Sequence, residues 1–246
     1  VEVSERFDNN QLHIHMKQYC HETADGSKKQ ALMIPIRFKV YHKDGKPMKG
    51  FPEVLNLTQD SQTFVFDCVQ NDVLVNYLQG FSAPIVLKRD LSLEKMMALM
   101  AIEQDGFALW DLKQTFMIQW IQKAYQEKEM KPLPLEMVAI FHSWFEKDKF
   151  SMAFLAKLFE LPSLPEIMAG LPEVCPIELF NMRELFALEF AKSCESLFLN
   201  VFVEYSHVEN RAVRAFRNVC LENLMLANPQ VFSETCWTYF ENAKNM

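Results

Sequence analysis

Hydrophobic and polar residues alternate along most of the first ninety positions. In Gln11–Tyr19, the residues Leu12, Ile14 and Met16 fall on one face of an extended chain and polar residues fall on the other. The same alternation runs through residues 32–41, where one face collects Leu32, Ile34, Ile36, Phe38 and Val40. Turn-forming pairs such as Asp25-Gly26 and Asp44-Gly45 separate the runs. Several short, half-buried strands at this spacing predict a small antiparallel β-sandwich over residues 1–90.

After Leu91 the period of the hydrophobic pattern changes from two to about 3.6. Ser92 is placed to cap the N-terminus of a helix whose apolar face holds Leu93, Met96, Met97, Met100 and Ala101. A second helix opens near Asp105, and Pro132 and Pro134 follow its end. Its apolar face holds Leu109, Leu112, Phe116, Met117, Trp120, Ile121 and Ala124.

The rest of the chain continues this helical pattern. Further helices are expected over about 135–147, 150–160, 177–204, 207–227 and 229–243. The proline-rich segment Pro162–Pro176 is expected to hold a short helix framed by turns. Consecutive helices with short links predict an all-α domain of HEAT-like, solenoid-type helical repeats over residues 91–246.

Composition narrows the class of protein. Half of the residues are hydrophobic and 23% are charged, which is typical of a globular chain with a packed core. The longest apolar runs are shorter than the roughly 18 residues that a membrane span needs, so no membrane partner is expected. The net charge of −7 falls entirely on residues 89–246, which makes nucleic acid an unexpected partner because its phosphates bind clustered Lys and Arg.

Six scattered cysteines indicate a reducing compartment. They lie at positions 20, 68, 175, 194, 220 and 236, with no C-x-x-C pair among them. This arrangement favours buried, reduced thiols in a cytoplasmic protein over a disulfide framework.

Histidines offer few candidate metal ligands. A helical His-Glu-x-x-His motif binds zinc through two imidazoles one turn apart, and the nearest match, His21-Glu22-Thr23-Ala24-Asp25, lacks the second His and falls at a turn. His13 and His15 share a strand face, and a third ligand there would complete a metal site. A solvated face is favoured because Lys17 shares it and repels a cation, and His42 beside Lys43 is read as a solvated hairpin residue.

Candidate catalytic groups are equally sparse. His142 with a cysteine would resemble a catalytic dyad, but cysteines such as Cys220 lie in apolar helical stretches that predict a core position. Glu222 and Glu234 have many acidic neighbours and are read as solvated helix faces, because nothing marks a close acid–base pair.

Two further groups could contact partners. Met96, Met97 and Met100 fit either a binding groove or, as favoured, the core. The last group, spaced at about one helical turn, comprises Arg211, Arg214 and Arg217. These arginines fit either a carboxylate-bearing partner or acidic residues of neighbouring helices, and the second is favoured in an acidic domain.

Five collinear segments resemble bacterial aminopeptidase N, a family of gluzincin zinc metallopeptidases. Residues 55–67 and 80–87 resemble the β-sandwich that follows its catalytic domain. Residues 104–111 resemble its Asn-Asp-Phe-x-x-Trp-Asp segment, and residues 214–221 resemble its Arg-x-x-Arg-Asn-x-Cys-Leu helix. Glu241–Met246 is similar to its Asn-Asn-Met-Thr-Asp site.

The resemblance implies a piece of a cytoplasmic bacterial enzyme: its third domain, over residues 1–90, and the first part of its helical C-terminal domain, over residues 91–246. In the whole enzyme a zinc-bound water attacks the first peptide bond of a peptide, and the helical domain closes over the catalytic domain and restricts access. The zinc motif and the Gly-x-Met-x-Asn motif are missing here. No catalytic, cofactor-binding or metal-binding residue is therefore carried over, and no cofactor is expected in this chain, although the parent enzyme binds zinc.

The expected role is structural. By this resemblance the partner is the catalytic domain of the same polypeptide, with peptides as partners of the parent enzyme, and this piece supports that domain and shapes substrate access. The start at Val1 and the stop at Met246 within a helical pattern are read as the ends of an excised piece. The alternative is a free-standing protein-interaction module, in which a sandwich is joined to a solenoid with a concave binding face.

Overall fold

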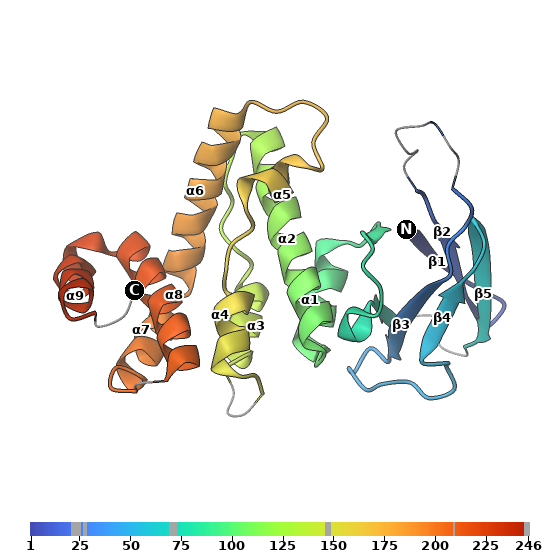
Figure 1. Cartoon of the computed structure of the whole chain (residues 1–246), viewed down its shortest axis with the longest axis horizontal. Helices are drawn as coiled ribbons and strands as arrows, with labels where there is room; N and C mark the ends of the chain where they lie inside the picture. The colour runs from blue at the N-terminus through green and yellow to red at the C-terminus, as the bar shows by residue number, and fades with distance from the viewer. Residues whose placement is uncertain (21–25, 27–28, 69–72, 146–148, 209, 244–246) are drawn as a thin grey trace. The chain divides into compact units, whose positions relative to one another are not determined.

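The computed structural model describes residues 1–20, 26, 29–68, 73–145, 149–208 and 210–243. The chain divides into two compact units, Val1–Leu112 and Lys113–Met246. The first contains the strands, the first helix and the start of the second helix, and the second contains the rest of that helix and the helices that follow it (Figure 1). No helix in the described ranges is long and apolar enough to cross a membrane.

Two small sheets form the β-sandwich of the first unit. One sheet has the strand order β5-β2-β1-β7 and the other has the order β4-β3-β6. Neighbouring strands are antiparallel, except that β1 pairs in parallel with the two-residue β7. The strands are β1 (Glu2–Asp8), β2 (Gln11–Lys17), β3 (Ile34–Tyr41), β4 (Val54–Leu57), β5 (Ser61–Asp67), β6 (Leu74–Tyr77) and β7 (Lys88–Arg89).

The alternating residues of the sequence form the core between these sheets. Leu12, Ile14 and Met16 of β2 are fully buried and share one cluster with residues of β3, β4 and β6. The pattern in 32–41 is confirmed from Ile34 onward, but Leu32 was wrongly placed on the buried face. It lies before β3 begins and is 53% exposed, because its segment leaves the sheet. The predicted turn at Asp25 lies outside the described residues.

The predicted turn at Asp44-Gly45 is confirmed. His42 N–H donates to the Lys46 carbonyl and Gly45 N–H donates to the His42 carbonyl, both at 2.9 Å. Gly45 has a φ of +84°, and a Cβ placed there would lie 2.6 Å from Cγ2 of Ile102. Glycine is therefore required at this position both by backbone conformation and by the close approach of Ile102.

We expect Gly45→Ala to lower the free energy of unfolding by roughly 2–3 kcal/mol, because it adds a steric overlap to the strain of a positive φ. Gly50→Ala is the matched control, since Gly50 has a φ of +97° but a Cβ added there would meet no neighbouring atom within 4 Å. Urea denaturation should show a loss of roughly 1 kcal/mol for the control. Equal losses for both variants would show that Ile102 does not restrict this turn.

The helices follow the predicted order with one break. Ser92 caps α1 as expected, because its side chain accepts a hydrogen bond from Lys95 N–H. Asp105 opens α2 by accepting from Ala108 N–H. The helices are α1 (Leu93–Ile102), α2 (Gly106–Glu127), α3 (Leu135–Ser143), α4 (Met152–Leu158), α5 (Leu164–Met168), α6 (Pro176–Ser193), α7 (Glu195–Glu204), α8 (Arg211–Ala227) and α9 (Pro229–Glu241), with a 3₁₀ turn η1 at Gln79–Phe81.

The single helix expected over 177–204 is wrong. The chain forms α6 and α7 instead, separated by Cys194, whose φ of −112° and ψ of 13° are not helical. Cys194 is fully buried, and Phe190 and Phe198 on its two sides lie with their rings 5.7 Å apart. The break therefore lets both helices direct an aromatic ring into the same core.

Aromatic rings fill the core of the second unit. Phe159, which follows α4, packs against rings from α3, α6, α7 and α8, at centroid distances from 5.7 to 6.2 Å. These partners are Phe141, Phe190, Phe198 and Phe216. Each such pair adds about 0.5–1.5 kcal/mol beyond simple burial, so this cluster fixes the packing of four helices.

Candidate functional site

One of the two strand histidines, His15, contacts two hydroxyl groups. His15 Nδ1 lies 2.9 Å from Thr63 Oγ1, and His15 Nε2 lies 3.3 Å from Ser61 Oγ on the neighbouring strand β5. The described residues contain no group of three or more His, Cys, Asp or Glu that could hold a metal ion. The segment His21–Asp25 lies outside them. His15 is exposed, as predicted, and its two ring nitrogens contact hydroxyl groups of the neighbouring strand.

Two of the core cysteines are not activated as nucleophiles. Burial raises the pKa of both Cys194 and Cys220 to about 12, so these thiols are protonated at neutral pH and lack the thiolate that a dyad needs. His142 is exposed at the end of α3. The expectation that the cysteines are buried is wrong for Cys20 and Cys175, which are exposed.

The structure places the methionines of α1 and the arginine Arg217, for which the sequence left two roles open. Met96 and Met100 are buried in the first unit, which confirms the favoured core position for these two, whereas Met97 is only half-buried and Ala101, which was placed on the same face, is exposed. Arg217 is buried and donates to the main-chain carbonyls of Tyr205 and Ser206, at 3.4 and 2.8 Å. Its predicted pairing with acidic residues is therefore wrong, because the end of the α7 segment supplies the acceptors.

The fold buries one carboxylate and surrounds it with hydrogen-bond donors, which the sequence did not predict. Glu103, directly after α1, is fully buried and accepts five hydrogen bonds. Three come from the side chains of Tyr41, Asn76 and Gln79, at 3.1, 2.6 and 2.8 Å, and two come from the next two main-chain N–H groups, at 2.9 Å. Burial and the Glu103 carboxylate raise the pKa of Tyr41. This network joins the segment between α1 and α2 to β3, β6 and η1 within the first unit.

Arg89 extends the network along β6. Its guanidinium donates to the Val75 carbonyl at 3.1 Å and to Asn76 Oδ1 at 2.8 Å, so Asn76 receives from Arg89 and donates to Glu103. The guanidinium also lies 5.6 Å from the Tyr77 ring centroid. These groups pair with one another, so the network is suited to structural support rather than to proton transfer.

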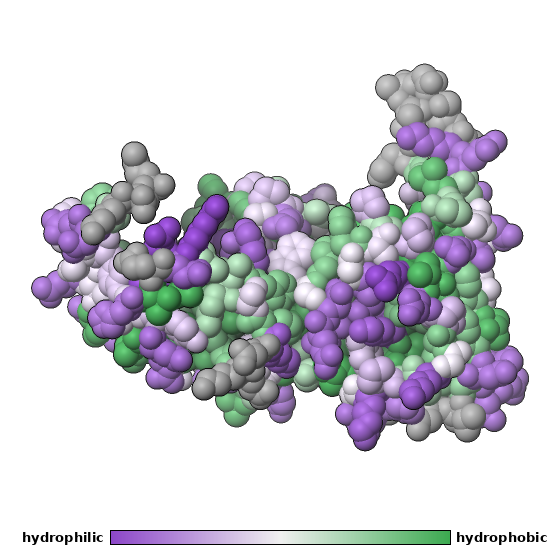
Figure 2. All heavy atoms as spheres, turned by 60° about the horizontal axis from the view of Figure 1, so that its bottom comes forward, coloured by the Kyte–Doolittle hydropathy of each residue, from purple (hydrophilic) through white to green (hydrophobic). Residues whose placement is uncertain are grey.

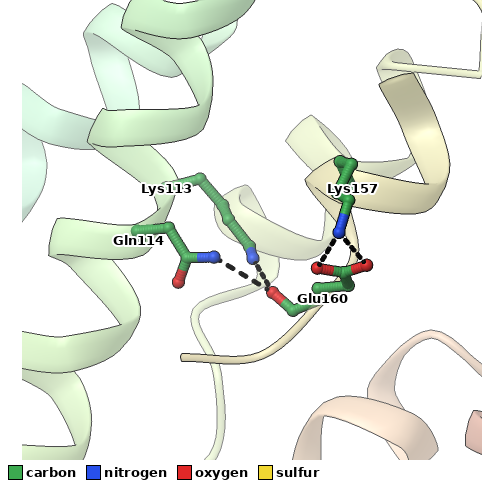
Figure 3. Close-up of polar contacts among 4 residues, drawn as sticks. All are labelled: Lys113, Gln114, Lys157 and Glu160. Atoms are coloured by element: carbon green, nitrogen blue, oxygen red, sulfur yellow. Dashed lines mark hydrogen bonds and ion pairs between the residues drawn. The ribbon is translucent and has the colours of Figure 1, made fainter. Parts of the chain in front are cut away.

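A buried lysine occupies the second unit. Lys113 of α2 has no exposed surface and donates to the main-chain carbonyl of Glu160, which also accepts from Gln114 Nε2 at 3.3 Å. Figure 3 shows both side chains directed at this oxygen, while the Glu160 carboxylate turns to Lys157. Burial lowers the pKa of Lys113 to about 7. A sequence signal existed, because Lys113 lies four residues from both Leu109 and Met117 on the apolar face of α2.

The second unit also contains a cavity that is open to solvent. A cavity of about 780 Å³ lies among the end of α4, α6, α8 and α9, which is within the roughly 300–1,000 Å³ range of ligand pockets. Its apolar lining includes Phe159, Ala187, Val219, Met225 and Leu226. Its charged lining consists of Glu160, Arg183, Glu184 and Glu222. This hollow is a candidate site for binding another molecule.

Apolar side chains also reach the surface of the helical unit. Figure 2 shows hydrophobic residues among hydrophilic ones on the face drawn. The most exposed apolar side chains of α9 are Trp237 and Phe240, at 60% and 72%, and their rings lie 5.6 Å apart. Exposed apolar clusters of this kind mark surfaces suited to contact with other protein.

Two protein-family models match successive parts of the chain. Residues 1–90 match DUF3458, described as a domain of unknown function with an Ig-like fold. Residues 93–246 match DUF3458_C, described as a domain of unknown function with ARM repeats. These descriptions agree with the sandwich and the consecutive helices of the structure, and they confirm the predicted fold class.

Relatives with known names are longer proteins. The chain is 29% identical over 239 residues to "Aminopeptidase N" of Escherichia coli (strain K12), a match that covers 91% of this chain and 28% of that protein. It is 26% identical over 245 residues to "Aminopeptidase N" of Haemophilus influenzae (strain ATCC 51907 / DSM 11121 / KW20 / Rd), covering 91% and 27%. The chain therefore spans less than a third of the length of these relatives.

A solved structure has the same fold over the whole chain. The crystal structure of Legionella pneumophila aminopeptidase A in complex with aspartic acid matches with a TM-score of 0.84 and 19% sequence identity. The match covers 100% of this chain and 30% of that one.

Proposed function

This chain belongs to the family that joins a DUF3458 Ig-like domain to DUF3458_C ARM repeats and is homologous to the C-terminal region of aminopeptidase N, and from this premise we propose that it is the non-catalytic C-terminal-side portion of a zinc aminopeptidase. One observation carries the proposal. Homology covers 91% of this chain but only 28% of the Escherichia coli protein. The catalytic machinery is accordingly assigned to the portion of the enzyme that this chain does not match.

In this proposal the chain is a scaffold with two parts. The sandwich, over residues 1–90, and the helical domain, over residues 91–246, support the catalytic domain of the same polypeptide and shape the access of peptides to it. Support comes from the polar network around Glu103, which fixes α1 to the sandwich within one compact unit. A scaffold needs such buried, paired groups because they resist local opening.

The assignment of cofactor and compartment follows the same premise. The zinc belongs to the parent enzyme, and this chain contributes no catalytic, cofactor-binding or metal-binding residue. The parent is proposed to be a cytoplasmic bacterial enzyme. The compartment is supported by the free cysteines of this chain, three of which are buried.

We expect the 246-residue chain to bind no zinc and to hydrolyse no alanyl chromogenic substrate, because the residues that perform these tasks lie elsewhere in the enzyme. The comparison is the polypeptide extended upstream to its full open reading frame, which should be zinc-loaded, active and inhibited by a chelator. Zinc content and initial rates are measured side by side at equal concentration. Substrate hydrolysis by the short chain, whether chelator-resistant or accompanied by stoichiometric zinc, would refute the proposal.

A second candidate function is a free-standing protein-interaction module. The hollow among α4, α6, α8 and α9 and the exposed Trp237–Phe240 pair favour it, since both present apolar surface to a partner. The open reading frame discriminates between the two functions. A zinc His-Glu-x-x-His motif encoded upstream supports the peptidase portion, whereas a start codon directly before Val1 supports the module.

A further inference from the structure

The hollow of the helical unit combines an apolar floor with an acidic rim. Phe159, Ala187 and Leu221 are buried in its floor, while Glu160 and Glu222 are exposed at its edge. Three carboxylates and one guanidinium line it, which gives a formal lining charge of −2 from Glu160, Glu184 and Glu222 against Arg183. Surfaces of this kind attract a group that is both apolar and cationic.

The ion pairs of the rim decide where a cation would bind. The Glu160 carboxylate receives Lys157 Nζ at 2.8 and 3.0 Å. The Glu184 carboxylate receives Arg183 Nη1 at 2.7 Å. Within the described chain Glu222 makes no ion pair, so its carboxylate is the one available to a new cation.

Arg183 does not turn the hollow into an anion site. Its Nε donates to the Pro162 carbonyl at 2.9 Å and its Nη1 is held by Glu184, so the guanidinium is fixed in the wall and already neutralised. An incoming carboxylate would meet the negative charges of Glu160 and Glu222 at the edge. The charge of the lining therefore selects against acidic ligands.

We propose that this hollow binds a short peptide segment in which an apolar side chain neighbours a Lys or Arg. The apolar side chain enters the floor formed by Phe159, Ala187 and Leu221, and the cation pairs with Glu222 at the rim. The volume of about 780 Å³ accommodates several side chains, which suits a peptide segment better than a single ion. Binding at this place requires neither zinc nor a catalytic domain, so it does not depend on the proposed function.

The test uses the whole 246-residue chain and a fluorescein-labelled hexapeptide of alternating Leu and Lys. Fluorescence anisotropy should show saturable binding that weakens as salt is raised from about 50 to about 300 mM, because salt screens an exposed ion pair. A hexapeptide of alternating Leu and Glu should bind at least tenfold more weakly. Equal affinity for both peptides, or no binding of the basic one, would overturn the proposal.

Two variants locate the site and control for net charge. Glu222→Lys reverses the charge of an exposed α8 residue and should raise the Kd for the basic peptide at least fivefold. Glu234→Lys makes the same charge change on the exposed surface of α9, away from the lining, and should leave the Kd within twofold. An equal loss of affinity in both variants would show that only the net charge of the chain matters, and it would refute the site.

A third variant separates shape from charge. Asn218→Trp introduces a bulky side chain at an exposed lining position of α8 without changing charge, and it should also raise the Kd at least fivefold because it occupies the hollow. Light scattering of the wild-type chain accompanies these titrations. A dimer that dissociates in the Asn218→Trp and Glu222→Lys variants would assign the hollow to a second copy of the chain and overturn the peptide proposal.

Discussion

Replacement of Lys113 by Met is expected to remove most of the increase in folding stability that the wild-type chain shows between about pH 7 and pH 8.5. Lys113 is fully buried, and burial lowers its pKa from the ordinary 10.5 to about 7. Between these two values the unfolded chain binds a proton that the folded chain has lost. The contribution of Lys113 to stability therefore rises with pH across this window and is lowest below pH 7, where the folded state must bury the ammonium.

The size of the effect follows from the two pKa values. At about 1.4 kcal/mol for each pH unit between them, the full window is on the order of 4–5 kcal/mol. Methionine keeps the length and volume of the side chain without the charge. The Glu160 carbonyl keeps a donor in the variant, because Gln114 Nε2 lies 3.3 Å from it. The variant should thus be more stable than the wild type at pH 6, and the difference should shrink toward pH 9.

Urea denaturation at pH 6, 7, 8 and 9 measures this difference. Lys123→Met is the matched control, since Lys123 is an exposed lysine on the same helix, and its variant should follow the wild-type pH dependence. Cys194 and Cys220 have pKa values raised to about 12, so their titration in the unfolded state lowers stability above about pH 8.5 in all three proteins. This thiol contribution is the same in all three proteins and therefore cancels when their pH profiles are compared. Parallel pH profiles for the wild type and Lys113→Met would contradict the assignment.

Replacement of Glu103 by Gln is expected to destabilise the first unit by roughly 3–5 kcal/mol. All five groups around Glu103 donate, which only a carboxylate can satisfy on both oxygens. The amide of glutamine has one oxygen, and its NH₂ would face donors. Several buried donors then lose their acceptor, each at about 1–3 kcal/mol.

Amide hydrogen exchange locates the loss of stability in the Glu103→Gln variant. Protection should fall at the amides of β3 and β6, because Tyr41 and Asn76 of these strands donate to Glu103. Glu53→Gln is the matched control in the same unit, since the Glu53 side chain is 87% exposed and its contact with Arg37 is 3.7 Å long. It should change stability by less than about 0.5 kcal/mol. Equal stability of the Glu103 variant and this control would show that the network contributes nothing.

Elements with a regular local period were predictable from the sequence. The strand around Leu12, Ile14 and Met16 and the apolar face of α2 were both found, because their side chains repeat at the period of the structure that they form. The ends of elements were less certain. The residue that separates α6 from α7, Cys194, is a small apolar residue that a continuous helix would tolerate, and the break depends on aromatic packing around it.

The candidate site was not predictable in the same way. Glu222 was read correctly as a solvated helix residue, but its place on the rim of a hollow depends on how α4, α6, α8 and α9 pack. Arg217 was given acidic partners on the basis of net charge, whereas the structure supplies the carbonyls of Tyr205 and Ser206. Composition gives the average surroundings of a residue and not its particular neighbours.

The sequence by itself predicted a run of strands followed by a run of helices, the change near residue 90 and the resemblance to aminopeptidase N, because hydrophobic period and motif order are properties of neighbouring residues. The tertiary structure alone decided which polar groups meet in the interior. Tyr41 and Glu103 are 62 positions apart, and Lys113 and Glu160 are 47 positions apart. Contacts over such separations leave no local pattern, and they arise only when packed elements bring the groups together and remove them from water.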